Sequence, residues 1–165
     1  MAKENSFDIV SEFDFQELRN AIDQVRKEIT TRYDFKNVKA EIDLQEDQIV
    51  VKTEDDMKLE AIRQMLITRV VARKLDPKIM KFEDPESSLG GNLKQNITLI
   101  KSMDTETAKK ISKLIREQFK KGPKPNIQGD SVRVTSKSRD ELQQVMAFLK
   151  EQEDFDVPIH FNNFR

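Results

Sequence analysis

The residues of this sequence that could hold an anion lie close together in its third quarter. Arg133 lies between two valines in an alternating run, and Lys137 and Arg139 follow directly after that run. By the two-residue period of a strand, the valines face one side of a sheet and Arg133 faces the other. Lys137 and Arg139 flank the start of a predicted helix, where free backbone amides favour an anion. We predict an anion site here, with Arg32 and Arg165 brought near by the fold; the alternative interpretation is a capping turn with incidental charge.

A second basic group follows helical spacing. Lys109, Lys113, Arg116 and Lys120 fall within about 60° of one another on a helix, away from its apolar side. Residues 94–139 hold 12 basic and 4 acidic residues, although the whole chain has a net charge of −1. Such a stripe could follow the phosphates of a nucleic acid without reading its sequence. The alternative interpretation is a solvated helix face.

Other chemistry is poorly supported. The chain has no cysteine and one histidine, His160, and base catalysis also needs a nucleophile and an orienting partner. Its four glycines cannot form a glycine-rich phosphate loop. We therefore predict a protein that is not an enzyme and has neither a metal site nor a cofactor.

Four segments with helical periodicity must position these residues. They begin near Asp14, Asp55, Asp104 and Ser138, each a residue type that caps a helix. Short alternating runs between them predict strands, including one near residues 6–13, one at 131–136 and one around His160. Residues 75–91 are the least clearly assigned segment.

The same order of elements occurs twice. A shift of 90 residues superposes the first and third helical segments, and a shift of 83 superposes the second and fourth. Strand, helix, strand, strand, helix, strand is the order of a ferredoxin-like sandwich. We predict an α+β protein of two tandem ferredoxin-like (βαββαβ) domains with antiparallel sheets, at residues 1–90 and 91–165.

Composition agrees with a folded protein that has a highly charged surface. Hydrophobic and charged residues each make up 36% of the 165 residues, and the two signs of charge nearly cancel. No apolar run approaches the roughly 18 residues of a membrane span, and residues 1–6 do not resemble a signal peptide. We expect a cytoplasmic protein without a membrane partner.

Four segments resemble the YajQ family of small bacterial proteins. They are SFDIVSE at 6–12, TRYDF at 31–35, IQGDSVRVTSKSRDELQQVMA at 127–147 and FNNFR at 161–165. The resemblance implies two ferredoxin-like domains whose N-terminal strands are exchanged, so that the strand near 6–13 packs in the other domain's sheet. It also implies a nucleotide-binding protein that is not an enzyme, with cyclic di-GMP among the family's reported ligands and nucleic acid among those suggested.

Two functions follow as hypotheses. The first is binding of a guanine nucleotide or cyclic di-GMP by a signalling adaptor that acts on a protein regulator. The second is binding of an RNA or DNA backbone through the basic helix and the open sheet face. Salt separates them, because a backbone binder loses affinity steeply as salt rises. The physiological ligand, the protein partner and the oligomeric state do not follow from the sequence.

Overall fold

A computed structural model describes residues 4–152 and 155–165. The helices within these residues coincide with the four predicted segments: α1 Phe15–Thr31, α2 Asp56–Ala72, α3 Thr105–Gln118 and α4 Arg139–Lys150. The residue before each helix accepts a hydrogen bond on its side chain from a backbone amide of the first turn. These residues are, respectively, Asp14, Asp55, Asp104 and Ser138. Such a cap satisfies an amide that has no partner within the helix. The cap positions repeat the predicted shifts of 90 and 83 residues.

The strands of the described residues form two antiparallel sheets. One sheet has the order β7-β8-β1-β9, with β1 Asn5–Val10, β7 Lys124–Gln128, β8 Ser131–Ser136 and β9 His160–Asn162. The other has the order β2-β3-β6-β4, with β2 Ala40–Leu44, β3 Gln48–Thr53, β4 Met80–Phe82 and β6 Leu93–Leu99. A two-residue strand, β5 Glu86–Ser87, pairs with β6. The predicted α+β class with two antiparallel sheets is confirmed.

Each sheet contains one inner strand that directly precedes the first helix of the other unit. β1 pairs with β8 and β9, although the chain continues from β1 into α1. β6 pairs with β3 and β4, although the chain continues from β6 into α3. The exchange of N-terminal strands that the resemblance implies is therefore confirmed, and each sheet has the strand arrangement of a ferredoxin-like fold.

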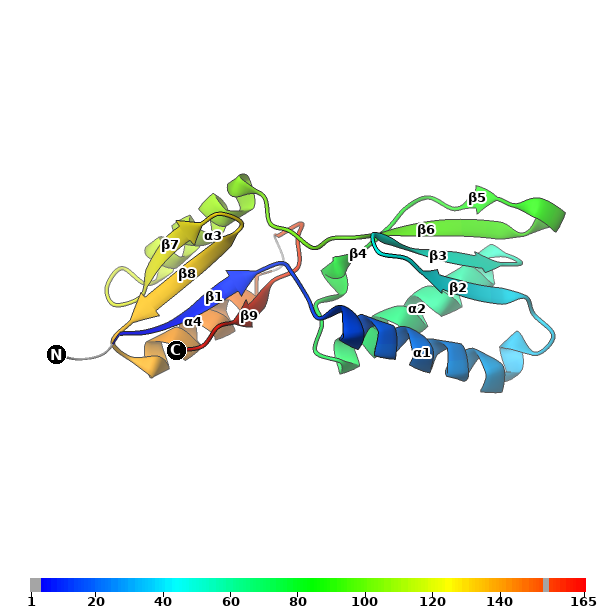
Figure 1. The fold of residues 1–165 in the computed structure, drawn as a ribbon, viewed down its shortest axis with the longest axis horizontal. Coiled ribbons are helices and arrows are strands. Elements are labelled where there is room, and N and C mark those ends of the chain that lie inside the picture. The colour runs from blue at the N-terminus through cyan, green and yellow to red at the C-terminus, as the bar shows by residue number, and fades with distance from the viewer. Residues whose placement is uncertain (1–3, 153–154) are drawn as a thin grey trace. The chain divides into compact units, whose positions relative to one another are not determined.

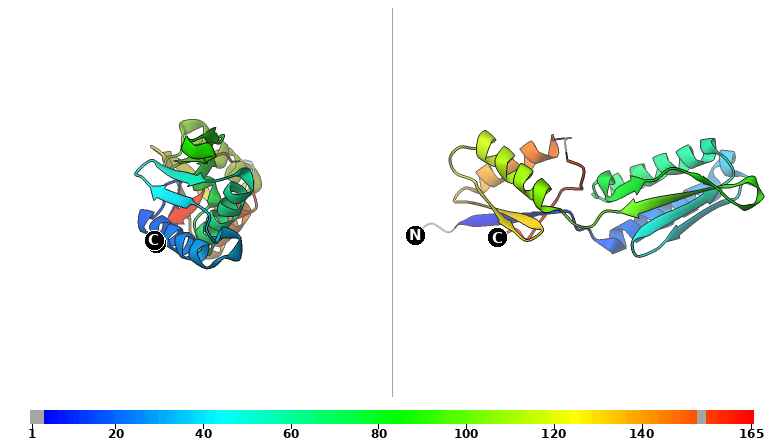
Figure 2. Two further views of the ribbon diagram at one scale, coloured as in Figure 1. Left: turned by 90° about the vertical axis from the view of Figure 1, so that its right-hand side faces the viewer. Right: turned by 90° about the horizontal axis from the view of Figure 1, so that it is seen from above.

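The backbone groups into two compact units. The α1–α2 unit consists of residues 13–100, and the α3–α4 unit consists of residues 1–12 and 101–165. In each unit the two helices lie on one face of the sheet and leave the other face open (Figures 1 and 2). The division into sequence repeats at 1–90 and 91–165 stays a prediction.

Each unit has its own apolar core between helices and sheet. In the α3–α4 unit, Phe7 and Ile9 of β1 and Val132 and Val134 of β8 pack against α3 and α4. In the α1–α2 unit, helix residues such as Leu18 pack against the inner faces of β2, β3 and β6. Burial of these faces is the main favourable term in folding. The alternating positions on the open faces are therefore left for polar contacts.

The least clearly predicted segment, residues 75–91, is built from short elements. It contains the 3-10 turns Pro77–Ile79 and Leu89–Gly91 together with β4 and β5. Strands of two or three residues carry too little periodicity to be read from sequence. None of the helices in the described residues is long and apolar enough to cross a membrane.

Candidate functional site

Arg133 lies on the open face of the sheet in the α3–α4 unit. Burial alternates along β8, so that Arg133 is only partly buried between two fully buried valines. The strand register places Arg133 opposite Asp8 of β1. Arg133 Nε donates to Asp8 Oδ1 at 2.8 Å, and Nη2 donates to Oδ2 at 3.3 Å. The residue does face outward, but its guanidinium group is already engaged by a carboxylate.

Asp8 connects three segments of the same sheet face. The hydrogen bond from Arg133 lowers the pKa of Asp8 most, the hydrogen bond from Asn163 and the charges of Arg133 and Arg165 lower it further, and burial opposes them. Asn163 Nδ2 donates to Asp8 Oδ2 at 2.9 Å. Asp8 is only 5% exposed. Removal of one partner from a buried ion pair is destabilising, because it leaves a buried charge without compensation. The carboxylate therefore holds β8 and the C-terminal segment against β1.

The C-terminal segment continues along β1 beyond this contact. Asn163 has a left-handed φ of 53°, and Ser6 and Arg165 then exchange two backbone hydrogen bonds of 3.1 and 3.0 Å. The Phe164 ring lies 6.2 Å from the Phe7 ring, with 24° between their planes. Phe164 is nevertheless 62% exposed. The segment thus holds an aromatic ring and an arginine at the surface.

A cavity of about 270 Å³ lies between this segment, β1 and α4. Its lining residues are Asn5, Ser6 and Phe7 of β1, Arg139, Leu142, Gln143 and Met146 of α4, and Phe164 and Arg165. The α4 residues share one helix face because they are three and four positions apart. The cavity combines an apolar wall with a rim of two guanidinium groups and two amides, which is the composition typical of small-molecule sites.

Local contacts fix the start of α4 beside the cavity. Ser138 Oγ accepts the amide of Glu141 at 3.3 Å, which caps the helix. Arg139 Nε donates to Asn5 Oδ1 at 3.3 Å, and Asn5 Nδ2 donates to the carbonyl of Lys137 at 3.4 Å. Asn5 therefore ties β1 to the β8–α4 turn. The Lys137 side chain is exposed and does not line the cavity.

Of the predicted anion-binding residues, the cavity brings together Arg139 and Arg165. Arg133 and Lys137 lie in the same unit outside it, and Arg32 belongs to the α1–α2 unit. The sequence did not reveal the lining residues of β1 or the inner face of α4. Positions 139, 142, 143 and 146 are spaced so that they share one face of a helix, but such a face is ordinarily interpreted as part of the core. The roles of all these residues stay predictions.

Comparison with known proteins decides the family. A family model described as "Nucleotide-binding protein YajQ-like" matches residues 5–165. The chain belongs to the YajQ family. Proteins named as nucleotide-binding proteins from Roseiflexus castenholzii and Acaryochloris marina are 48% and 51% identical to it over 166 and 165 residues. A protein of the same description from Prochlorococcus marinus is 46% identical over 166 residues, and all three alignments cover both chains completely.

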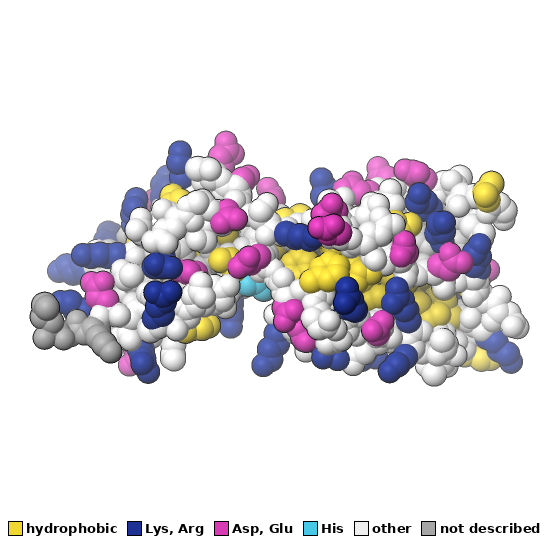
Figure 3. Space-filling model, viewed as in Figure 1, with side chains coloured by type: hydrophobic (Ala, Val, Ile, Leu, Met, Phe, Trp, Pro, Cys, Tyr) yellow, Lys and Arg dark blue, Asp and Glu magenta, His cyan; other side chains and the backbone are white. Residues whose placement is uncertain are grey.

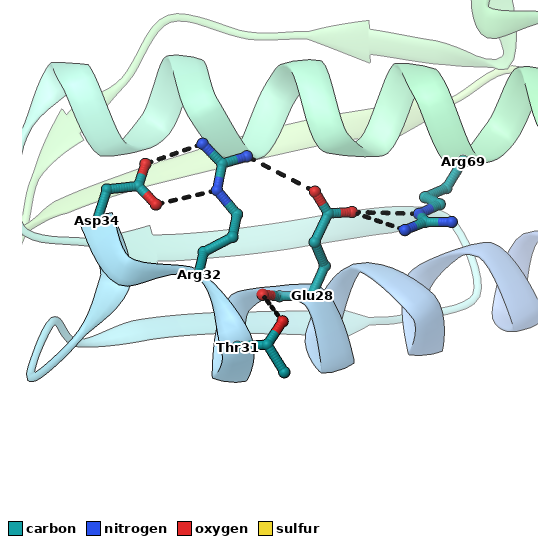
Figure 4. Close-up of polar contacts among 5 residues, drawn as sticks. All are labelled: Glu28, Thr31, Arg32, Asp34 and Arg69. Atoms are coloured by element: carbon teal, nitrogen blue, oxygen red, sulfur yellow. Dashed lines mark hydrogen bonds and ion pairs between the residues drawn. The ribbon is translucent and has the colours of Figure 1, made fainter.

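In this YajQ protein Arg32 belongs to an ion-pair cluster (Figure 4). Its Nε and Nη2 donate to the two carboxylate oxygens of Asp34 at 3.0 and 2.9 Å, and its Nη1 lies 3.6 Å from Glu28. Arg69 also donates to Glu28, at 3.0 and 3.2 Å. The hydrogen bonds that Arg32 donates to Asp34 are the main cause that raises the pKa of Arg32 and lowers the pKa of Asp34. The cluster joins the end of α1 to α2.

The four stripe residues are all exposed, but only Lys109, Lys113 and Arg116 lie in α3, because the helix ends at Gln118 and Lys120 follows it. Lys109, Lys113, Arg116 and Lys120 make no ion pair with any residue in the described ranges. Figure 3 shows Lys and Arg side chains gathered on the side of the α3–α4 unit where α3 lies. The apolar side of the helix, including Ile111 and Ile115, is buried in the core. The predicted role of the stripe in binding a polymer stays a prediction.

In the described part of this YajQ chain, no group of three or more His, Cys, Asp or Glu side chains could hold a metal ion. His160 lies in β9, partly buried and opposite Val10 of β1. His160 therefore occupies one position in the pairing of β9 with β1.

Proposed function

We propose that this protein binds a nucleotide, without catalysis, in the cavity between α4, β1 and the C-terminal segment. The observation that carries the proposal is that Arg139, Arg165 and the exposed Phe164 ring meet at one cavity. Relatives aligned over their whole length are named nucleotide-binding proteins, which supports the same ligand class.

Each part of the cavity suits one part of a nucleotide. A base can stack on the open side of Phe164, and aromatic stacking contributes about 1–3 kcal/mol per base. The two guanidinium groups can each bind phosphate oxygens through paired hydrogen bonds. The side-chain amides of Asn5 and Gln143 offer both a donor and an acceptor to the edge of a base. A guanine base presents both kinds of group, so the proposed ligand is a guanine nucleotide.

Size sets how much of a ligand the cavity covers. Small-molecule cavities are commonly about 300–1,000 Å³, and this one is about 270 Å³. It therefore suits one nucleotide unit better than two. Bound cyclic di-GMP would have one guanylate enclosed and the other outside, where a protein regulator could contact it. This arrangement agrees with a signalling adaptor that reports its ligand to a partner.

Isothermal calorimetry with GMP, GTP and cyclic di-GMP tests the proposal. Arg139→Ala and Arg165→Ala should each weaken binding roughly tenfold or more, because a hydrogen bond to a charged group contributes about 1.5–3 kcal/mol. Lys137→Ala is the matched control, since it removes a nearby exposed cation outside the cavity. Recovery of unchanged ligand by chromatography is expected after long incubation. Equal loss in the control and in the arginine variants, or absence of binding, would contradict the proposal.

A second candidate function is binding of a nucleic-acid backbone. It is favoured by the four exposed stripe cations, which have no ion-pair partner among the described residues. Lys109→Ala with Lys113→Ala should weaken binding of a single-stranded oligonucleotide and flatten the dependence of log K on log salt by about 0.7 for each lost contact. The same double variant should leave binding of a mononucleotide unchanged. An unaltered salt slope would argue that the stripe is only a solvated face.

A further inference from the structure

A second cavity, of about 320 Å³, lies where α3 ends and β7 begins. Its lining residues are Arg116, Phe119, Lys120, Pro123, Lys124 and Pro125. It shares no lining residue with the cavity beside α4. The two cavities can therefore be tested separately.

The lining of this second cavity combines cations with conformationally stiff residues. Three of its six residues are cations, and none is an acid. Pro123 and Pro125 are buried, and the Phe119 ring packs edge-to-face on Phe148 with centroids 5.8 Å apart. Prolines and a packed ring lose little conformational entropy when a ligand binds.

The backbone turn after α3 brings these cations together. Gly122 has a φ of 98°, which residues with a side chain rarely adopt. The turn places Lys124 of β7 beside the last turn of α3, which carries Arg116. Lys120 lies beyond the end of α3 and Lys124 begins β7, so the turn, rather than a shared helix face, brings both of them to Arg116.

These cations are not explained as caps of the helix end. The last carbonyls of a helix carry about half a negative charge, and basic side chains commonly bind them. The C-cap contact here is instead the amide of Phe119, which donates to the carbonyl of Ile115. Arg116, Lys120 and Lys124 make no side-chain hydrogen bond or ion pair within the described residues. Three cations outweigh the helix end together with the Glu141 carboxylate beside Gly122, so the cavity keeps a net positive charge.

We propose that this cavity binds a phosphomonoester, the terminal phosphate of a nucleotide or of a nucleic-acid strand. A phosphomonoester carries about −1.5 to −2 charges at pH 7 and three acceptor oxygens, which matches three converging cations better than a singly charged backbone diester does. The cavity lies at the end of the α3 stripe, since Arg116 and Lys120 belong to both. A strand that follows the stripe would therefore present its terminal phosphate here. The proposal is independent of the nucleotide site beside α4.

The test uses the full-length protein labelled with ¹⁵N and three probes: inorganic phosphate, and a single-stranded oligonucleotide with either a 5′-phosphate or a 5′-hydroxyl. Phosphate should shift the amide signals of residues 116–125 and leave those of residues 5–7 and 139–146 in place. The 5′-phosphate strand should bind about tenfold more tightly than the 5′-hydroxyl strand, the effect of about one charge-assisted hydrogen bond. Inorganic phosphate reports the isolated group, and the two strands show whether a polymer end is the preferred source.

Lys124→Ala should abolish that tenfold preference, whereas the neighbouring control Lys121→Ala, an exposed cation outside the cavity, should keep it. Lys124→Gln repeats the test with a side chain of similar length, and circular dichroism verifies the fold of each variant. Equal loss in the Lys121 and Lys124 variants would show a diffuse positive field and overturn the proposal. Failure of Arg139→Ala to affect nucleotide binding would count only against the first cavity.

Discussion

Replacement of Asp8 by Asn removes a charge from the open sheet face of the α3–α4 unit while almost keeping the side chain's shape. The carboxylate accepts three hydrogen bonds, two from Arg133 and one from Asn163, and is 5% exposed. An amide in its place must turn its NH₂ group toward one of these donors. A hydrogen bond to a charged group contributes about 1.5–3 kcal/mol, and the 31% exposure of the Arg133 side chain lets water replace part of the loss. We expect Asp8→Asn to lower the free energy of unfolding by about 2 kcal/mol at pH 7.

The pH dependence makes this prediction specific. Because the folded protein lowers the pKa of Asp8 below its ordinary 3.8, the folded state binds fewer protons than the unfolded state. The stabilisation is therefore complete above pH 4–5 and is lost as the pH falls through the folded pKa. The difference in the free energy of unfolding between Asp8→Asn and the unchanged protein should therefore shrink as the pH falls through the folded pKa of Asp8.

Urea unfolding followed by circular dichroism, at pH values from 7 to 3, measures this difference. Asp156→Asn is the matched control, an exposed acid in the same unit as Asp8. A difference that stayed constant as the pH fell would refute a contribution from the ionised carboxylate.

Three further changes have expected outcomes. Asp55→Ala removes the cap of α2 and should lower the free energy of unfolding by about 1 kcal/mol, measured by urea denaturation. Glu28→Gln leaves two arginines without their shared carboxylate, and should cost about 1 kcal/mol at low salt and less at 1 M salt, because salt screens a partly exposed pair. Gly122→Ala should lower the melting temperature, because its positive φ is strained for alanine at a cost of about 1 kcal/mol or more. The added Cβ would also displace the Glu141 carboxylate. An unchanged melting temperature would show that the turn tolerates a Cβ.

The helices and the residues at which they begin could be predicted from the sequence alone. The four helices follow from apolar spacing, and their starts follow from capping side chains at 14, 55, 104 and 138. These signals act within one or two turns of the chain, so the sequence alone contains them. The sequence also showed the duplicated order of elements and the resemblance to the YajQ family, and both predicted the α+β class.

Tertiary structure decided which of the predicted groups meet. Arg133 was correctly expected on the outer face, yet its partner Asp8 is 125 positions away, and no local pattern predicts that register. Arg139 and Arg165 reach one cavity because the C-terminal segment pairs with β1, whereas Arg32 folds into the other unit. Lys124 reaches the end of α3 only through the turn at Gly122. Composition and periodicity report which side chains face outward, whereas the pairing of distant strands determines which of them converge on one ligand.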